Sequence, residues 1–461
     1  MEAVYPGQCA VSVEHDKGVM EAGLFRFLRF SLGLEGEVKG LLEGRKGAFD
    51  WDACYQFAKR QTLVGVLFDG IQRLPKELAP ARPLLLRWLS DSESIRRRNM
   101  RMDRASAYVY NKVCAAGFRC CILKGQGNAL LYPHPSSRIP GDVDVWVMAN
   151  REELRHIALS LTEGDGSSLQ ESLNHIGLTV HGVSVELHST PALLNSPLHN
   201  SRLQKWLKRN ADLQCSNRIA LPNNAGEVAV PTLSFNIIYQ LCHLFHHCFY
   251  EGVGLRQIVD YYFVLKNTDF SGNTNGASGN TDCFSGNTDC DGVLSNTDFT
   301  DNTDRIGGNA ESDGSLMNTD CTDFTDSSSG GVVEVDSGGA LVALQEELKW
   351  LGLWEFAGAV MYVLREVMGL DEKRMICTPD ERRGRLLLEE IMAGGNFGHY
   401  DTRNHFGKGA LWHNIQRFRR DWRMLRFYPS EALSEPLFRV CHFLWRWKQK
   451  HAGKPKERNR N

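Results

Sequence analysis

The chain has 461 residues, of which 42% are hydrophobic and 23% are charged, and its formal net charge at pH 7 is −2. This length predicts two or three domains of an ordinary globular protein, and the small net charge excludes a general attraction to nucleic acid or to anionic membranes. The 13 scattered cysteines, together with the absence of a signal peptide or a long apolar stretch, predict a cytoplasmic protein without disulfides or a membrane span.

The first region, residues 1–117, shows repeated helical periodicity. Apolar residues recur every three or four positions in "GLFRFLRFSLGL", in "WDACYQFAKRQTLVGVLFDGIQRL" and in the long segment that begins "PLLLRWLSDSES". We therefore expect a helical N-terminal region.

A small mixed β-sheet core is predicted for residues 118–230. The segment "FRCCILKG" is a short apolar run that ends at a glycine, and "GDVDVWVM" alternates between apolar and polar residues. The segment "GLTVHGVSVELHS" is typical of a hairpin that turns near His181 and Gly182.

Helical patterns return in residues 231–266, which we expect to extend this core, and in residues 339–461, a C-terminal helical region with a basic tail. Between them, residues 267–338 repeat Asn-Thr-Asp in a background of serine and glycine. The Asp and Asn oxygens could bind calcium, but neither an EF-hand loop nor a glycine-rich nonapeptide repeat fits the pattern. Because the segment has very few apolar residues, we predict a disordered insertion.

The strand "GDVDVWV" carries two aspartates inside an otherwise buried pattern. Its alternation puts Asp142, Asp144 and Trp146 on one face and the three valines on the other. Like charges about 7 Å apart on one sheet face repel each other, so we expect a cation between them. The sequence therefore predicts a divalent metal site, and it predicts that the two aspartates destabilise each other without metal.

Two further segments add groups to this site. "LKGQGNALLY" places Lys124 and Gly125 between a strand and a short helix, where a glycine turn, free backbone N–H groups and a positive charge predict a phosphate site. In "VSVELHS", Glu186 and His188 share the polar face of a strand. If this strand is a neighbour of "GDVDVWV", Glu186 becomes a third carboxylate beside the two aspartates.

The order of these features, a Lys-Gly turn, an arginine, "GDVDVWV" and then "VELH", resembles the nucleotidyltransferase superfamily typified by DNA polymerase β. More narrowly, residues 85–266 resemble the bacterial family usually labelled uncharacterised nucleotidyltransferase, in which Leu-Lys-Gly precedes Arg-x-x-Gly-Asp-x-Asp. The resemblance implies an α+β fold with a small mixed-sheet, polymerase β-like core between N-terminal and C-terminal helical regions. It also implies an enzyme, dependent on Mg²⁺ or Mn²⁺, that transfers a nucleoside monophosphate from a nucleoside triphosphate to an acceptor hydroxyl and releases pyrophosphate.

By the same resemblance, Asp142, Asp144 and Glu186 would be the catalytic, metal-binding carboxylates. Gly125 matches the turn glycine of the family, but Gln126 stands where the wider superfamily has a serine that binds triphosphate. The nucleotide-binding residues are then expected to be Lys124, Gly125, Gln126, Arg138 and Gly141. The alternative is a catalytically degenerate protein that binds nucleotide or acts as a scaffold, and the acceptor can be a small molecule, a protein or RNA.

"CHLFHHCFYEG" places His243 and His247 on one face of a helix, with His246 and Cys248 beside them. This cluster could bind zinc, but no clear third ligand follows at a metalloprotease spacing. We expect these histidines to pack the helix or to line the nucleotide pocket.

Arg256 and Asp260 are also four residues apart, and they are expected to form an ion pair on the helix surface or, by the family resemblance, to position the substrate. The basic and aromatic residues of 411–461 could bind RNA. The near-zero net charge and the lack of an RNA-binding motif favour an ordinary amphipathic helix instead. The sequence carries no clear signal of an oligomer.

Overall fold

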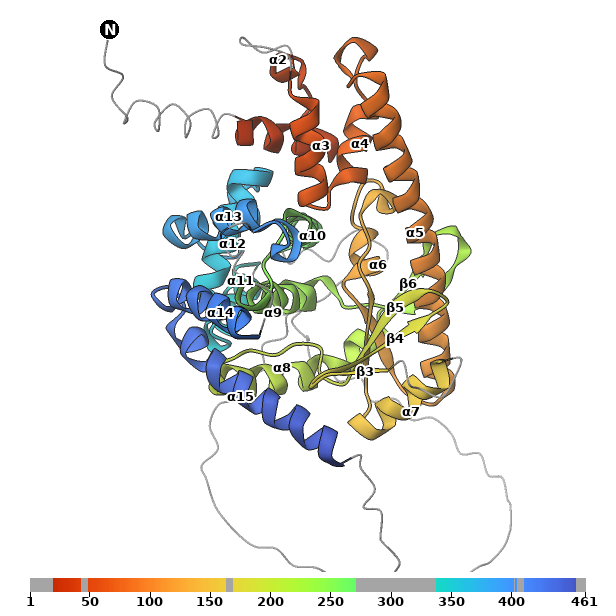
Figure 1. Ribbon diagram of the computed structural model, residues 1–461, viewed down its shortest axis with the longest axis vertical. Coiled ribbons are helices and arrows are strands. Elements are labelled where there is room, and N and C mark those ends of the chain that lie inside the picture. Colours follow the sequence, from red (N-terminus) through yellow and green to blue (C-terminus); the bar gives the residue numbers. More distant parts are fainter. Residues whose placement is uncertain are drawn as a thin grey trace, which may run out of the picture.

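The computed structural model describes residues 20–42, 49–162, 169–270, 337–401, 403 and 410–452. Most of the predicted Asn-Thr-Asp insertion therefore lies outside the described residues. A five-stranded mixed sheet lies among helices from every part of the chain (Figure 1). This arrangement agrees with the predicted combination of a small mixed sheet and helical regions.

Helices form most of the described part of the N-terminal region, as predicted. Asp50 caps α3, because its side chain accepts a hydrogen bond from the N–H of Ala53 at 2.9 Å. Gly65 of α4 lies against the backbone of Ser137, and a Cβ there would come within 2.3 Å of the Ser137 carbonyl oxygen. The helices span residues 20–31, Lys39–Leu42 (α2), Trp51–Arg60 (α3), Val64–Gln72 (α4) and Arg82–Ala115 (α5).

The sheet has the strand order β1-β2-β5-β4-β3, in which β2 and β5 are parallel and the other neighbours are antiparallel. The predicted hairpin joins β4 to β5 through His181 and Gly182, whose φ angles of 49° and 74° suit a two-residue type I′ turn. The register of the parallel pair sets Asp144 beside Glu186. The strands span Cys120–Leu123 (β1), Val143–Val147 (β2), Gln170–Glu171 (β3), His175–Val180 (β4) and Val183–His188 (β5).

Helices cover both faces of this sheet (Figure 1). Helices α5 and α7 contact it on one side, whereas Phe235 of α9 stacks on Trp146 of β2, with 5.8 Å between the ring centroids. The face of β2 that carries Asp144 therefore looks toward α9. The elements that follow β1 and complete this part are Gly125–Ala129 (α6), Arg151–Leu161 (α7), Pro197–Ser216 (α8), Leu233–Tyr250 (α9), Leu255–Asn267 (α10) and a separate hairpin of Arg218–Leu221 (β6) and Gly226–Ala229 (β7).

The C-terminal helices pack on α9 and α10. Phe245 of α9 stacks on Phe356 of α12 with 4.6 Å between the ring centroids, and its ring centroid lies 5.1 Å from that of Tyr428. Buried residues from Leu24 to Ala432 form one hydrophobic cluster, so the described regions pack against one another around a shared core. These helices span Ser337–Trp350 (α11), Trp354–Met368 (α12), Glu381–Gly394 (α13), Ala410–Leu425 (α14) and Pro429–Ala452 (α15).

The nine described cysteines are all free thiols. Cys120 and Cys121 are buried in β1, and burial raises the pKa of the Cys121 thiol well above its usual range. None of the described helices is both long and apolar enough to cross a membrane.

Candidate active site

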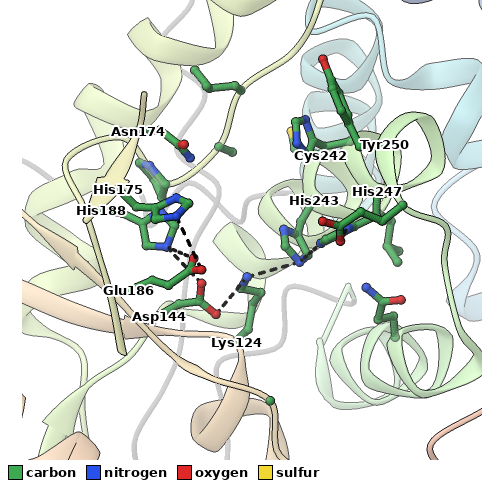
Figure 2. A pocket seen from close by; sticks show the side chains of 18 of the residues that line it. Lys124, Asp144, Asn174, His175, Glu186, His188, Cys242, His243, His247 and Tyr250 are labelled. Carbon is green, nitrogen blue, oxygen red and sulfur yellow. Dashed lines mark hydrogen bonds and ion pairs between the residues drawn. The ribbon is translucent and has the colours of Figure 1, made fainter. Parts of the chain in front are cut away.

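A pocket of about 520 Å³ lies between the polar face of β2 and β5 and the helices α9, α10, α14 and α15. Figure 2 shows how side chains from the two sides approach each other in it. Asp144, Glu186 and His188 come from the sheet, His243 and His247 come from α9, and Lys124 lies between the two groups.

Three carboxylates meet on the sheet side of this pocket. Glu186 lies beside Asp144 because β2 and β5 are neighbours, and Asp142 precedes β2. One oxygen atom from each of Asp142, Asp144 and Glu186 lies within 4.8 Å of the other two. Hard divalent cations prefer such oxygen ligands, and Mg²⁺ binds them at about 2.1 Å. Small rotations of the three side chains would therefore bring their oxygens to the distances that one metal ion requires.

Lys124 reaches this group from the turn between β1 and α6. Its Nζ lies 3.0 Å from Oδ2 of Asp144 and 3.2 Å from Nε2 of His243. The lysine expected to bind phosphate is therefore also the counter-charge of Asp144.

His188 provides a second partner for the same aspartate. Its Nε2 donates a hydrogen bond to Oδ1 of Asp144 at 3.0 Å and lies 3.3 Å from Oε2 of Glu186. Burial opposes protonation of the imidazole, but the two carboxylates outweigh it and raise the pKa of His188 to about 8. Burial also opposes ionisation of Asp144, yet Lys124 and His188 hold the pKa of that carboxyl below its usual range.

The predicted repulsion between the two aspartates is present, but it falls unequally on them. Protein cations compensate Asp144, and the remaining repulsion acts on Asp142. The charge of Asp144, followed by burial, raises the pKa of Asp142 from 3.8 to about 6, although Lys124 acts in the opposite direction.

Arg138 and Asp260 form a buried ion pair at the wall of the pocket. Nε and Nη2 of Arg138 each lie 2.7 Å from one carboxylate oxygen of Asp260, and the hydroxyl of Tyr132 donates to Oδ1 at 2.7 Å. The expected surface pair between Arg256 and Asp260 is therefore wrong. Helix α10 is buried on nearly all sides and has no solvent-exposed face at Asp260. Asp260 therefore pairs with Arg138, which lies in the loop before β2.

Arg256 lines the same wall, and among the described residues no carboxylate forms an ion pair with it. Its Nη1 donates to the carbonyl of Ile139 at 3.0 Å, while its Nε and the Nη1 of Arg138 are buried without a partner in the described part of the chain. Burial, followed by the charge of Arg138, lowers the pKa of Arg256. Buried guanidinium donors that lack a partner are costly, so this wall is suited to an anion.

The remaining residues expected to bind nucleotide do not all face the pocket. Gly125 and Gly141 line it, and the Gly141 carbonyl accepts a hydrogen bond from Nη2 of Arg98 at 3.0 Å. The side chain of Gln126 is buried elsewhere and donates to Asp103 of α5. The side chain of Gln126 therefore attaches α6 to α5, and a contact of this residue with nucleotide stays a prediction.

His243, His246 and His247 line the pocket, as one of the readings of this cluster predicts. Nε2 of His247 lies 2.9 Å from Nε2 of His243. Burial, followed by the charge of Lys124, keeps the pKa of His243 well below its usual range, so a neutral imidazole faces the lysine. Within the described residues, none of the three belongs to a group that could hold a metal ion.

Two further histidines of the pocket were not predicted. Sequence reasoning puts His188 on the polar face of its strand without assigning it a role, and it misses His175. A hairpin that turns at His181 and Gly182 pairs His175 with His188, so the predicted turn already implied this juxtaposition.

Residues 47–275 match a family model described as "Uncharacterised nucleotidyltransferase". Among solved structures, the chain is similar to the crystal structure of an antigenic nucleotidyltransferase-like protein from Paracoccidioides brasiliensis, with 16% sequence identity over 36% of this chain and 75% of that chain. The TM-score of that similarity is 0.24. No curated protein matches the chain. The matched residues include β2 and β5, the strands that carry Asp144 and Glu186.

Proposed function

We propose that this protein is a metal-dependent nucleotidyltransferase that transfers a nucleoside monophosphate from a nucleoside triphosphate to an acceptor hydroxyl. The observation that carries the proposal is the convergence of Asp142, Asp144 and Glu186, whose oxygens lie within 4.8 Å of one another. They share one pocket with buried arginine donors that have no partner among the described residues. Carboxylates for a cation and guanidinium groups for an anion are together what a metal–triphosphate substrate requires.

The three carboxylates would hold Mg²⁺ or Mn²⁺. When bound, such an ion supplies charge neutralisation at the triphosphate and lowers the pKa of the acceptor hydroxyl. Arg138 and Arg256 line the same pocket, and Nε of Arg256 and Nη1 of Arg138, which are buried without a partner among the described residues, would donate to phosphate oxygens after small side-chain rotations. Their ordering by Asp260 and by the Ile139 carbonyl keeps both guanidinium groups in place before substrate arrives.

Lys124 would exchange partners when substrate binds. Its ammonium contacts Asp144 and neutral His243 in the structure, and a triphosphate offers it a stronger negative charge at the same place. Release of Asp144 from Lys124 then leaves a carboxylate oxygen for the metal ion. The pocket could therefore couple phosphate binding to metal binding.

In the reaction, the acceptor oxygen forms a bond to the α-phosphorus, and the bond from that phosphorus to the bridging oxygen of pyrophosphate breaks. The electron pair of the broken bond leaves with pyrophosphate. We propose that Glu186 takes up the proton of the acceptor hydroxyl, because its side chain is 28% exposed in the pocket.

Calorimetry with a non-hydrolysable triphosphate tests the binding step. We expect binding to require Mg²⁺ or Mn²⁺ and to be lost in Asp142→Asn/Asp144→Asn. Asp212→Asn serves as the matched control, since Asp212 pairs with Arg119 on the surface and its side chain is 78% exposed. Equal binding by the double variant and the control would reject the site.

The Lys124–Asp144 contact also favours one alternative, a degenerate protein that binds nucleotide without turnover. An ammonium group that stayed 3.0 Å from Asp144 would occupy the place of the cation. Pyrophosphate release distinguishes the two functions, because only the transferase produces it. A transfer assay with α-labelled nucleotides on a lysate of the source cell would identify whether the acceptor is a small molecule, a protein or RNA.

A further inference from the structure

We propose that His175, Glu186 and His188 form a binding site for one transition-metal ion next to the three carboxylates. The proposal deepens the proposed function, on which its biological meaning rests, because it concerns the metal ions of the same pocket. It adds nitrogen ligands to a site that the sequence describes with oxygen ligands alone.

The site is built by the hairpin of β4 and β5. The antiparallel register places His175 opposite His188, and their ring centroids are 5.1 Å apart. Glu186 precedes His188 by two residues, so its side chain emerges on the same face of β5. Figure 2 shows both imidazoles turned toward the carboxylate of Glu186.

The distances between the potential ligand atoms fit a bound ion. Nε2 of His188 lies 3.3 Å from Oε2 of Glu186, and Nε2 of His175 lies 3.6 Å from Oε1 of the same residue. A tetrahedral Zn²⁺ with bonds of about 2.0–2.2 Å holds neighbouring ligand atoms about 3.4 Å apart. One ligand atom from each of the three residues lies within 4.8 Å of the others, so small rotations complete the geometry.

Groups around these ligands support the same conclusion. A hydrogen bond of 2.9 Å joins Oγ of Ser172 to Nδ1 of His175, and such a bond to the second ring nitrogen is typical of histidines that bind metal. When Nε2 of His188 coordinates the ion it releases its proton to solvent, and Oδ1 of Asp144, 3.0 Å from that Nε2, then becomes available as a fourth ligand. The Nδ1 of the buried His188 lies on the other side of its ring and has no partner among the described residues, so this outer hydrogen bond is present at His175 and not at His188.

The ligand types decide which metal this group selects. Mg²⁺ prefers oxygen ligands and keeps its waters, whereas imidazole nitrogen suits Zn²⁺, Co²⁺ and similar ions. A pair of histidines with one shared carboxylate therefore favours a transition metal. The neighbouring group of three carboxylates remains suited to Mg²⁺, and Glu186 belongs to both groups.

Cobalt titration of the metal-free, nucleotide-free full-length protein tests this site, because Co²⁺ in a nitrogen-containing site has visible d–d absorption. We expect saturable absorption in the wild-type protein and in His156→Gln, a control histidine that is exposed on α7. Loss of an outer partner of a metal ligand alone costs about tenfold to a hundredfold in affinity. We therefore expect His175→Gln to bind Co²⁺ at least about tenfold more weakly, and Ser172→Ala to fall between it and the wild-type protein.

Thermal melts show whether each variant is folded, and Ser172→Ala, which keeps every ligand, provides the test should His175→Gln fail to fold. Absence of saturable absorption in the wild-type protein, or equal affinity in the wild-type protein and both variants, would overturn the proposal. Nucleotide binding with Mg²⁺ is measured separately. A protein that binds nucleotide with Mg²⁺ but shows no cobalt spectrum would refute the transition-metal site alone, and the reverse result would refute the proposed function alone.

Discussion

The two aspartates of β2 are expected to respond in opposite directions to the same substitution in metal-free protein. Asp144 is bonded to Lys124 and His188, both at 3.0 Å. Asp142 has a raised pKa, because the charge of Asp144 and burial disfavour its ionised form. Asp142→Asn should therefore stabilise the metal-free fold, whereas Asp144→Asn should destabilise it.

The magnitude for Asp142 follows from its pKa, which rises from 3.8 to about 6 on folding. A difference of about two pH units corresponds to about 3 kcal/mol, at about 1.4 kcal/mol per unit. The sign follows because a raised pKa of an acid penalises the folded state above about pH 6, and the penalty disappears below the unfolded pKa near 4. The substitution should thus raise the free energy of unfolding by about 3 kcal/mol near pH 8 and have little effect near pH 4.

For Asp144, removal of the carboxylate leaves Lys124 and His188 without their shared counter-charge. Breaking a buried ion pair from one side costs about 3–5 kcal/mol, so we expect a loss of that size near pH 7. Urea denaturation in EDTA, repeated across this pH range, measures both variants against the wild-type protein.

A shift of the same sign for the two variants near neutral pH would refute this reasoning. The same holds if stabilisation by Asp142→Asn were independent of pH, because the effect would then not arise from repulsion between carboxylates. With Mg²⁺ and triphosphate present, both variants should lose the stabilisation that ligand binding gives to the wild-type protein.

Three further predictions concern the arginine wall and the packing behind it. Arg256→Met should weaken triphosphate binding by about tenfold to a hundredfold in calorimetry, since charged hydrogen bonds contribute about 1.5–3 kcal/mol each; unchanged affinity would remove Arg256 from the site. Asp260→Asn should lower the free energy of unfolding by about 3–5 kcal/mol in urea, because Arg138 would remain buried without its partner, and a neutral result would contradict the buried pair. Gly65→Ala should lower the free energy of unfolding by about 1–3 kcal/mol in the same assay, because the new Cβ would clash with the carbonyl oxygen of Ser137. A stabilised variant would show that the two backbones are farther apart than described.

Local periodicity explains how much of the sheet could be predicted from the sequence. The segments expected to form strands correspond to β1, β2, β4 and β5, and the hairpin turn falls at His181 and Gly182 as expected. Alternation along a strand depends only on the geometry of the extended chain. The face shared by Asp142 and Asp144 was therefore predictable before any partner strand was known.

The partners of these residues depend on tertiary structure. Glu186 lies beside Asp144 because β2 pairs in parallel with β5, and the connection between these two strands runs through α7, β3 and β4. Gln126 turns toward α5 although it follows a pocket residue, because the short helix α6 packs on that helix. No pattern in the neighbouring sequence predicts either contact, Asp144 with Glu186 or Gln126 with α5.

The sequence by itself determined which strands carry the carboxylates and which way these side chains face. The tertiary structure decided how their charges are balanced, because the compensating groups come from distant segments: Lys124 lies in the turn after β1, and His188 is the last residue of β5. Side-chain direction follows from the local backbone, whereas the energy of a buried charge depends on every charge and dipole within a few ångströms of it. Only folding brings these groups to that distance.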